Sequence, residues 1–215
     1  MSTATDHTVD ADTTTGPVRS LLPPRALAVS WIVAGAIGWT VSFLLYLEYV
    51  GQLTDADPIV SCTLSVVVSC GPNLLSPGGN LLGFSNSIIG IVSFLGPVFG
   101  GVGALAGGAY RRWYWRVFVA AVAAAYVLVH VFAWRSVFEY GVLCPWCMVV
   151  WLVVIPLFWA TLGWALASGV VGHGRTPRAI GSRLSSWLAL IVLADYLVIA
   201  VAAQVRLEVL QSLIG

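Results

Sequence analysis

The residues best suited to chemistry are four cysteines, which fall into two pairs. Cys62 and Cys70 stand eight residues apart, and Cys144 and Cys147 form a C-x-x-C motif whose second residue is Pro145. Cysteines three apart at a helix start are close enough for a disulfide, and proline suits the first helical turn because its missing N–H is not needed there. A helix N-terminus also favours a thiolate, which is a nucleophile and a good leaving group. The motif therefore predicts a redox-active pair.

The wider pair, Cys62 and Cys70, has a different geometry. Eight residues of straight helix would separate the two Cα atoms by about 12 Å, whereas a disulfide needs a separation below about 7 Å. If these cysteines pair, the segment between them must bend or be partly non-helical. A mobile segment suits a shuttle that accepts electrons outside and delivers them to a second cysteine pair.

Three uses of the four cysteines compete: thiol–disulfide electron transfer, two structural disulfides, and a metal site such as a Cu(I) site with four thiolates. A C-x-x-C disulfide closes a very small loop and constrains the chain little, which weakens the structural use. The metal site lacks supporting ligands, because the chain has only two methionines, one of them the initiator, and His173 is expected on the other side of the membrane. We therefore favour redox transfer without a metal.

The composition decides where these cysteines must work. Of the 215 residues, 59% are hydrophobic and 9% are charged, with a formal net charge of +1, whereas soluble domains carry about 25% charged residues. So few charges exclude an ordinary soluble domain and a disordered chain, and the near-neutral balance gives no basic surface for nucleic acid. The sequence predicts an integral membrane protein.

Five apolar runs are long enough, or nearly so, to cross a bilayer as helices. They are residues 26–49, 81–109, 117–134, 142–171 and 184–205. The runs are continuous and do not alternate, which excludes a strand barrel. The fold class is therefore an all-α integral membrane protein, with a four-helix bundle and a fifth transmembrane helix.

Arginines set the predicted orientation through the positive-inside rule. Eight of the ten basic residues precede the first span, or lie between the second and third or the fourth and fifth; only Arg135 and Arg206 lie on the other side. We expect a multi-pass protein of the inner (plasma) membrane with a cytoplasmic N-terminus and an extracytoplasmic C-terminus. All four cysteines then face the oxidising, extracytoplasmic compartment.

The predicted organisation follows from these spans. Residues 1–25 form a disordered cytoplasmic tail, 26–171 a redox bundle with an extracytoplasmic loop at 50–80, 172–183 a cytoplasmic loop, and 184–215 the fifth helix and C-terminus. No signal peptide is expected, because the first apolar run starts after about two dozen polar residues.

Other residues in the spans have structural interpretations. Asp195 is a functional hypothesis by default because it is an acid inside the membrane, but we favour a polar helix contact or an oligomer contact. His130 is expected to be a packing histidine, and Glu48 to end the first span.

Glycines from Gly100 to Gly108 indicate close helix packing. Tryptophans near span ends indicate an aromatic belt: Trp31, Trp113, Trp115, Trp134 and Trp187.

The chain resembles the vitamin K epoxide reductase family, including its bacterial homologues. The resemblance rests on the Cys62/Cys70 pair, on Ser76 six residues later, on a serine–asparagine–serine motif around Asn86 at a helix start, and on the C-x-x-C. Order and topology agree over roughly residues 25–170. Many bacterial members continue through a fifth helix into a thioredoxin-like domain. Because this chain stops at Gly215, we expect the thioredoxin-like partner to be a separate exported protein.

The resemblance implies a relay from exported dithiols to a membrane quinone (menaquinone or ubiquinone), with disulfide formation as the result. By match, Cys62 exchanges with the partner, Cys70 with Cys144, and Cys147 faces the quinone. Asn86 matches a hydrogen-bond donor to the quinone; its alternative is a helix N-cap.

One position departs from the family pattern. Trp151 stands where the vertebrate enzymes have a tyrosine, and tryptophan offers an N–H but no hydroxyl. Trp151 is therefore a second candidate donor to the quinone, and the departure favours plain quinone reduction over epoxide reduction. The alternatives are a vitamin K quinone or epoxide reductase, and a non-catalytic metal-binding or transport protein.

Overall fold

The structure is a computed structural model, and it describes residues 21–54, 67–80, 82–108, 110–172 and 174–209. The described chain is helical, with one isolated parallel β-bridge between Val68 and Leu143. The helices are α1 Arg25–Thr54, α2 Gly71–Leu75, α3 Asn86–Leu105, α4 Arg112–Trp134 with its π-helical continuation η1 Arg135–Tyr140, α5 Pro145–Ala167, α6 Arg175–Ser186 and α7 Leu188–Leu207. Five of them are long and apolar enough to span a membrane, as predicted.

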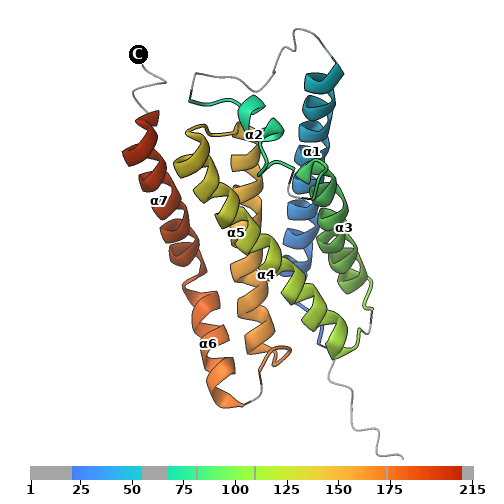
Figure 1. The fold of residues 1–215 in the computed structure, drawn as a ribbon. Coiled ribbons are helices and arrows are strands. Elements are labelled where there is room, and N and C mark those ends of the chain that lie inside the picture. The colour runs from blue at the N-terminus through green and yellow to red at the C-terminus, as the bar shows by residue number, and fades with distance from the viewer. Residues whose placement is uncertain (1–20, 55–66, 81, 109, 173, 210–215) are drawn as a thin grey trace, which may run out of the picture.

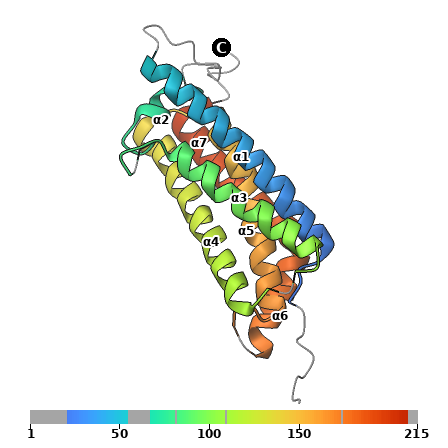
Figure 2. The same cartoon turned by 90° about the vertical axis from the view of Figure 1, so that its right-hand side faces the viewer.

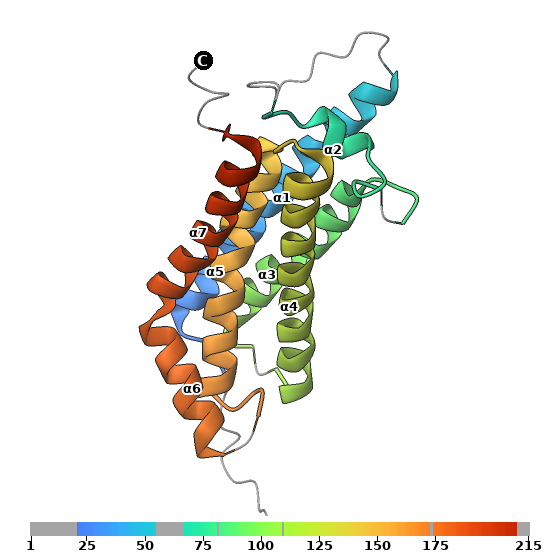
Figure 3. The same cartoon turned by 60° about the vertical axis from the view of Figure 1, so that its left-hand side comes forward.

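The helices run roughly along one axis (Figure 1). The short α2 lies at the end where α5 begins, and we call this end of the bundle the cysteine end. α1 and α3 run side by side, and α7 lies against α5 (Figures 2 and 3).

Helix ends differ from the apolar runs because turn residues can also be apolar. The second run begins at residue 81, but α3 begins only after its N-cap Ser85, whose hydroxyl accepts from the backbone N–H of Ser87. The fourth run begins at 142, but α5 begins at Pro145, because Gly141 at φ 67° has ended the preceding helix. Only a residue tolerant of positive φ ends a helix in this way.

The segment 172–183, expected as a cytoplasmic loop, contains the start of a helix, because the chain is helical from Arg175 as α6. Gly181 brings α6 against α5: a Cβ there would stand 2.4 Å from the backbone nitrogen of Ala167. The segment carries Arg175, Arg178 and Arg183, so it is not an apolar run, and apolar length does not reveal its helix.

Close contact between α1 and α3 depends on glycine. A Cβ at Gly101 would stand 2.5 Å from the carbonyl oxygen of Ala28, and a Cβ at Gly35 would stand 2.8 Å from the carbonyl oxygen of Phe94. The small residues expected to support close packing in this part of the chain therefore do so at Gly101.

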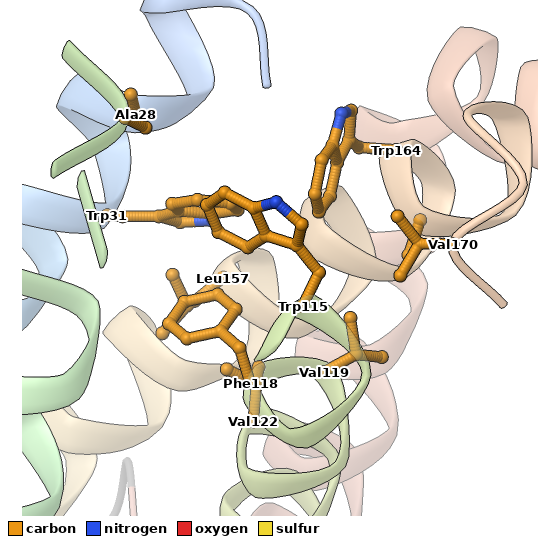
Figure 4. Packing of buried hydrophobic residues seen from close by; sticks show 11 residues of the cluster. Ala28, Trp31, Trp115, Phe118, Val119, Val122, Leu157, Trp164 and Val170 are labelled. Carbon is orange, nitrogen blue, oxygen red and sulfur yellow. The ribbon is translucent and has the colours of Figure 1, made fainter. Parts of the chain in front are cut away.

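Aromatic rings fill the end of the bundle opposite the cysteines. Trp31, Trp115, Trp164 and Phe118 meet there with ring centroids 4.7–6.0 Å apart (Figure 4). Trp31 and Trp115 are fully buried, and the Trp31 indole donates to the Thr161 hydroxyl at 2.8 Å. Assigning these two to an aromatic belt was therefore wrong: they belong to the core. The exposed Trp113, Trp134 and Trp187 fit the belt.

Candidate redox site

The C-x-x-C motif opens α5. Cys144 is the N-cap, Pro145 occupies the first helical position, and the Cys144 sulfur accepts from the backbone N–H of Cys147 at 3.3 Å. Cys144 is fully buried, whereas Cys147 is partly buried. Both are free thiols.

A two-residue pairing brings Cys70 of the other cysteine pair to this point. Leu143 donates its N–H to the carbonyl of Val67 at 2.8 Å, and its own carbonyl accepts from Ser69 at 2.9 Å. Cys70 follows Ser69 and Cys144 follows Leu143, so the pairing also holds these two cysteines together. Their sulfurs lie 3.2 Å apart. This pairing has no periodic pattern, so the sequence gives no sign of it.

The two sulfurs are in different redox states. Cys70 is disulfide-bonded and fully buried, and it faces the free thiol of Cys144. Its disulfide partner lies outside the described residues, as does Cys62. A thiolate exchanges with a disulfide by attacking one of its sulfurs, and this arrangement places the reacting sulfurs next to each other.

The surroundings of Cys144 favour its thiolate. A hydrogen bond from the Cys147 side chain is the main cause that lowers the pKa of Cys144, and the backbone N–H groups of Cys147 and Trp146 add to it. Burial raises the pKa in part, and so does the negative charge of Glu48. The net shift is downward, as expected for a thiol at a helix N-terminus.

Ser76 organises the loop beside the cysteines. Its hydroxyl donates to the Asn73 carbonyl at 2.8 Å and accepts from the Gly79 N–H at 3.0 Å. The Asn73 side chain in turn donates to the carbonyl of Val142 at 3.1 Å, just before the C-x-x-C. Sequence reasoning missed Asn73, because nothing in its spacing points to Val142, 69 residues away.

Asn86 is the first residue of α3, and it is not the N-cap, because Ser85 takes that position. The helix-cap alternative for Asn86 is therefore wrong. Its side-chain amide donates to the Gly78 carbonyl at 2.5 Å, and the Gly78 N–H donates to the Tyr140 hydroxyl at 3.0 Å. The Asn86 side chain is thus held in a fixed direction by a loop that η1 also fixes.

Trp151 lies one turn after Cys147 on α5 and is 6% exposed. Both residues belong to one apolar cluster, to which α3 contributes Phe94 and α7 contributes Ala203. Cys147 therefore borders an apolar interior, whereas Cys144 borders the loop cysteine. The structure does not bring Asn86 into this cluster, since it lies two turns before Phe94 on α3.

Asp195 makes a polar helix contact, one of its two favoured interpretations. It accepts hydrogen bonds from Tyr126 at 2.7 Å and Trp159 at 3.0 Å, and a hydrogen bond of 2.8 Å joins it to Nε2 of His130. His130 is therefore more than a packing residue. The i, i+4 spacing of Tyr126 and His130 puts them on one face of α4, which is the signal that could have found them.

Among the described residues, no group of three or more His, Cys, Asp or Glu side chains is placed to hold a metal ion. The adjacent sulfurs of Cys70 and Cys144 are arranged for exchange between sulfurs, because one of them is already in a disulfide.

Comparison with known proteins gives one match. The sequence model of the vitamin K epoxide reductase family matches residues 29–162, which include α1 to α4 and most of α5. No curated protein and no solved structure matches the chain.

Proposed function

The chain belongs to the vitamin K epoxide reductase family and is a multi-pass membrane oxidoreductase of the quinone or quinone-epoxide type; from this premise, we propose that it oxidises an exported thioredoxin-like dithiol protein and reduces a membrane quinone. The net result is disulfide formation in exported proteins. One observation carries this proposal: the free Cys144 thiol lies 3.2 Å from the sulfur of the disulfide-bonded Cys70.

In the proposed relay, Cys62 is the disulfide partner of Cys70. A thiolate of the exported protein attacks Cys62, and its second thiol then releases the protein as a disulfide, leaving Cys62 and Cys70 reduced. The Cys70 thiolate attacks Cys144 of the oxidised C-x-x-C and frees Cys147. Cys62 then attacks Cys70, which restores the loop disulfide and frees Cys144.

The last step transfers two electrons from the Cys144–Cys147 dithiol to the quinone, which takes up two protons and becomes the hydroquinone. We assign quinone contact to Cys147 because it borders the apolar cluster around Trp151. Asn86 and Trp151 are the proposed donors to the quinone oxygens. A donor aimed at the oxygen stabilises the negative charge that develops when the thiolate attacks the ring. Ser76 supports the loop that orients Asn86.

The proposed orientation has all four cysteines and the C-terminus on the extracytoplasmic side, as the arginine count predicts. The cysteine end then meets exported proteins, and the lipid-soluble quinone enters sideways from the membrane.

The competing functions have less support. Trp151 lacks the hydroxyl that epoxide reduction would use in the vertebrate enzymes, and a four-thiolate metal site is incompatible with Cys70 in a disulfide.

Cys147→Ala tests the proposal in the purified full-length protein, given a reduced thioredoxin-like protein and a short-chain quinone. We expect quinone turnover to be lost, because no dithiol can form, while a Cys70–Cys144 mixed disulfide accumulates. Val198→Ala on the lipid-facing side of α7 is the control and should turn over normally. Normal quinone reduction by Cys147→Ala would end the proposal.

A further inference from the structure

The fifth transmembrane helix, α7, lies outside the segment that the family model matches. At its middle, Asp195 reaches into the bundle and receives hydrogen bonds from two other helices. Tyr126 donates from α4 and Trp159 from α5, and His130 of α4 shares a hydrogen bond with the carboxyl group. One carboxylate therefore ties three helices together.

The hydrogen bonds show that the His130–Asp195 pair shares one proton. Nδ1 of His130 lies 3.0 Å from the Tyr126 carbonyl oxygen, which can only accept, so Nδ1 carries a hydrogen. Nε2 lies 2.8 Å from the Asp195 carboxyl, and such a contact needs one proton between the two atoms. The pair is therefore neutral as a whole, which limits the cost of keeping it inside a membrane.

One face of α7 packs against α4 and α5. Val192, Tyr196, Ile199, Ala203 and Leu207 recur at the spacing of a helix seam and join the apolar cluster of α4 and α5. Asp195 lies on the same face, and the Tyr196 hydroxyl adds a bond to the Leu152 carbonyl at 2.8 Å. The side chains on the opposite face are exposed: Val198 is 69% exposed and Val205 is 79% exposed.

The seam of α7 continues to the cysteine end. Ala203, 7% exposed, lies in the same cluster as Cys147, Met148 and Trp151. Leu207 reaches to within 3.9 Å of the position that a Cβ would take at Gly141, three residues before the C-x-x-C. The C-terminal half of α7 therefore lines the apolar region beside Cys147. Figure 3 shows that α7 runs along α5.

We propose that Asp195 is a positioning residue for quinone binding: with His130, Tyr126 and Trp159 it fixes α7 so that the seam around Ala203 closes the apolar site beside Cys147. This inference rests on the proposed reduction of a quinone by the C-x-x-C. Asp195 touches no reacting atom, so it acts through the placement of the helix that carries it.

The test compares two substitutions of Asp195 in the purified full-length protein, with a short-chain quinone as the varied substrate. Asp195→Leu removes every acceptor, and we expect the KM for quinone to rise at least about tenfold while kcat falls less than about twofold. Asp195→Asn should restore the wild-type KM, because its carbonyl oxygen accepts from Tyr126 and Trp159 and its amide donates to Nε2 of neutral His130. Val198→Leu, on the exposed face of α7, is the matched control.

A second variant covers the case in which Asp195→Leu does not fold. Ala203→Phe leaves the polar cluster intact but forces α7 away from α5 beside Cys147, and it should raise the same KM. The inference is overturned if a folded Asp195→Leu or Ala203→Phe variant has the wild-type KM for quinone. It is also overturned if Asp195→Asn raises that KM as much as Asp195→Leu does. Wild-type protein without quinone turnover would instead refute the proposed function.

Discussion

At the scale of single residues, Cys144 combines contact with Cys70 and a stabilised thiolate. Because its pKa is lowered, mainly by the Cys147 side chain, the reactive thiolate persists to a lower pH than an ordinary thiol allows. The reverse exchange, in which the Cys144 thiolate attacks the disulfide of Cys70, should therefore slow as the pH falls through this lowered value, because protonation removes that nucleophile. The same shift contributes stability at higher pH that is lost as the thiolate is protonated.

Cys147→Ser and Cys147→Ala form a matched pair for measuring this effect when Cys62 and Cys70 are both replaced by alanine, because Cys144 is then the only thiol and cannot enter a mixed disulfide. The serine hydroxyl still donates to the Cys144 sulfur, whereas alanine cannot. We expect Cys144 to titrate at a higher pH in the alanine variant, measured by the ultraviolet absorbance of the thiolate. Equal titration curves would show that the backbone alone sets the shift.

Asn86 has two functions that substitution can separate. Asn86→Ala should lower quinone turnover about 10- to 1000-fold, the effect of losing one oxyanion donor, with the thiol-exchange steps intact. The substitution also removes the bond to Gly78, so Ser76→Ala, which loosens the same loop without touching the Asn86 amide, is the control. If turnover falls equally in both variants, the loss comes from disorder of the loop and not from a lost donor to the quinone.

The sequence could predict the chemistry of the cysteines but not the contact between Cys70 and Cys144. The C-x-x-C is a local pattern, and it correctly predicted a helix start with Pro145 in the first turn. The contact of Cys70 with Cys144 spans 74 residues and depends on a single bridge beside Leu143. A two-residue pairing has no period, so only the folded chain reveals it.

At the scale of elements, apolar length predicted the five long helices but not the polar helix α6 or the short α2. Apolar length also failed to separate Trp31 and Trp115, which lie in the core, from the belt tryptophans, because all of them stand near span ends. What distinguishes Trp31 is a partner on another helix, Thr161.

The contact between α1 and α3 gives a prediction about helix packing. Gly101→Ala should destabilise the bundle by about 1–3 kcal/mol, because the new Cβ meets the Ala28 carbonyl and the helices must separate. Gly96→Ala, on the same helix with nothing within 4 Å, should be neutral or stabilising. Thermal unfolding in one detergent compares the two, and equal midpoints would show that the contact is not close in the membrane.

At the scale of the whole molecule, the two ends of the bundle differ in chemistry. The cysteine end holds the sulfur relay, and the opposite end holds buried tryptophans beside arginines. Arg112 and Arg116 donate there to the carbonyls of Gly169 and Val170 after α5. Such a bundle can join a compartment of exported proteins to the membrane interior only if its cysteine end faces outward.

Orientation is therefore the prediction on which the proposed partner depends. In a variant that keeps Cys62 alone, an impermeant maleimide should label intact cells, because the arginine asymmetry keeps the opposite end in the cytoplasm. The matched control keeps one new cysteine at the exposed Ser182 of α6, which should react only after lysis. The reverse pattern would place the relay in the reducing cytoplasm, where an exported dithiol protein could never reach Cys62.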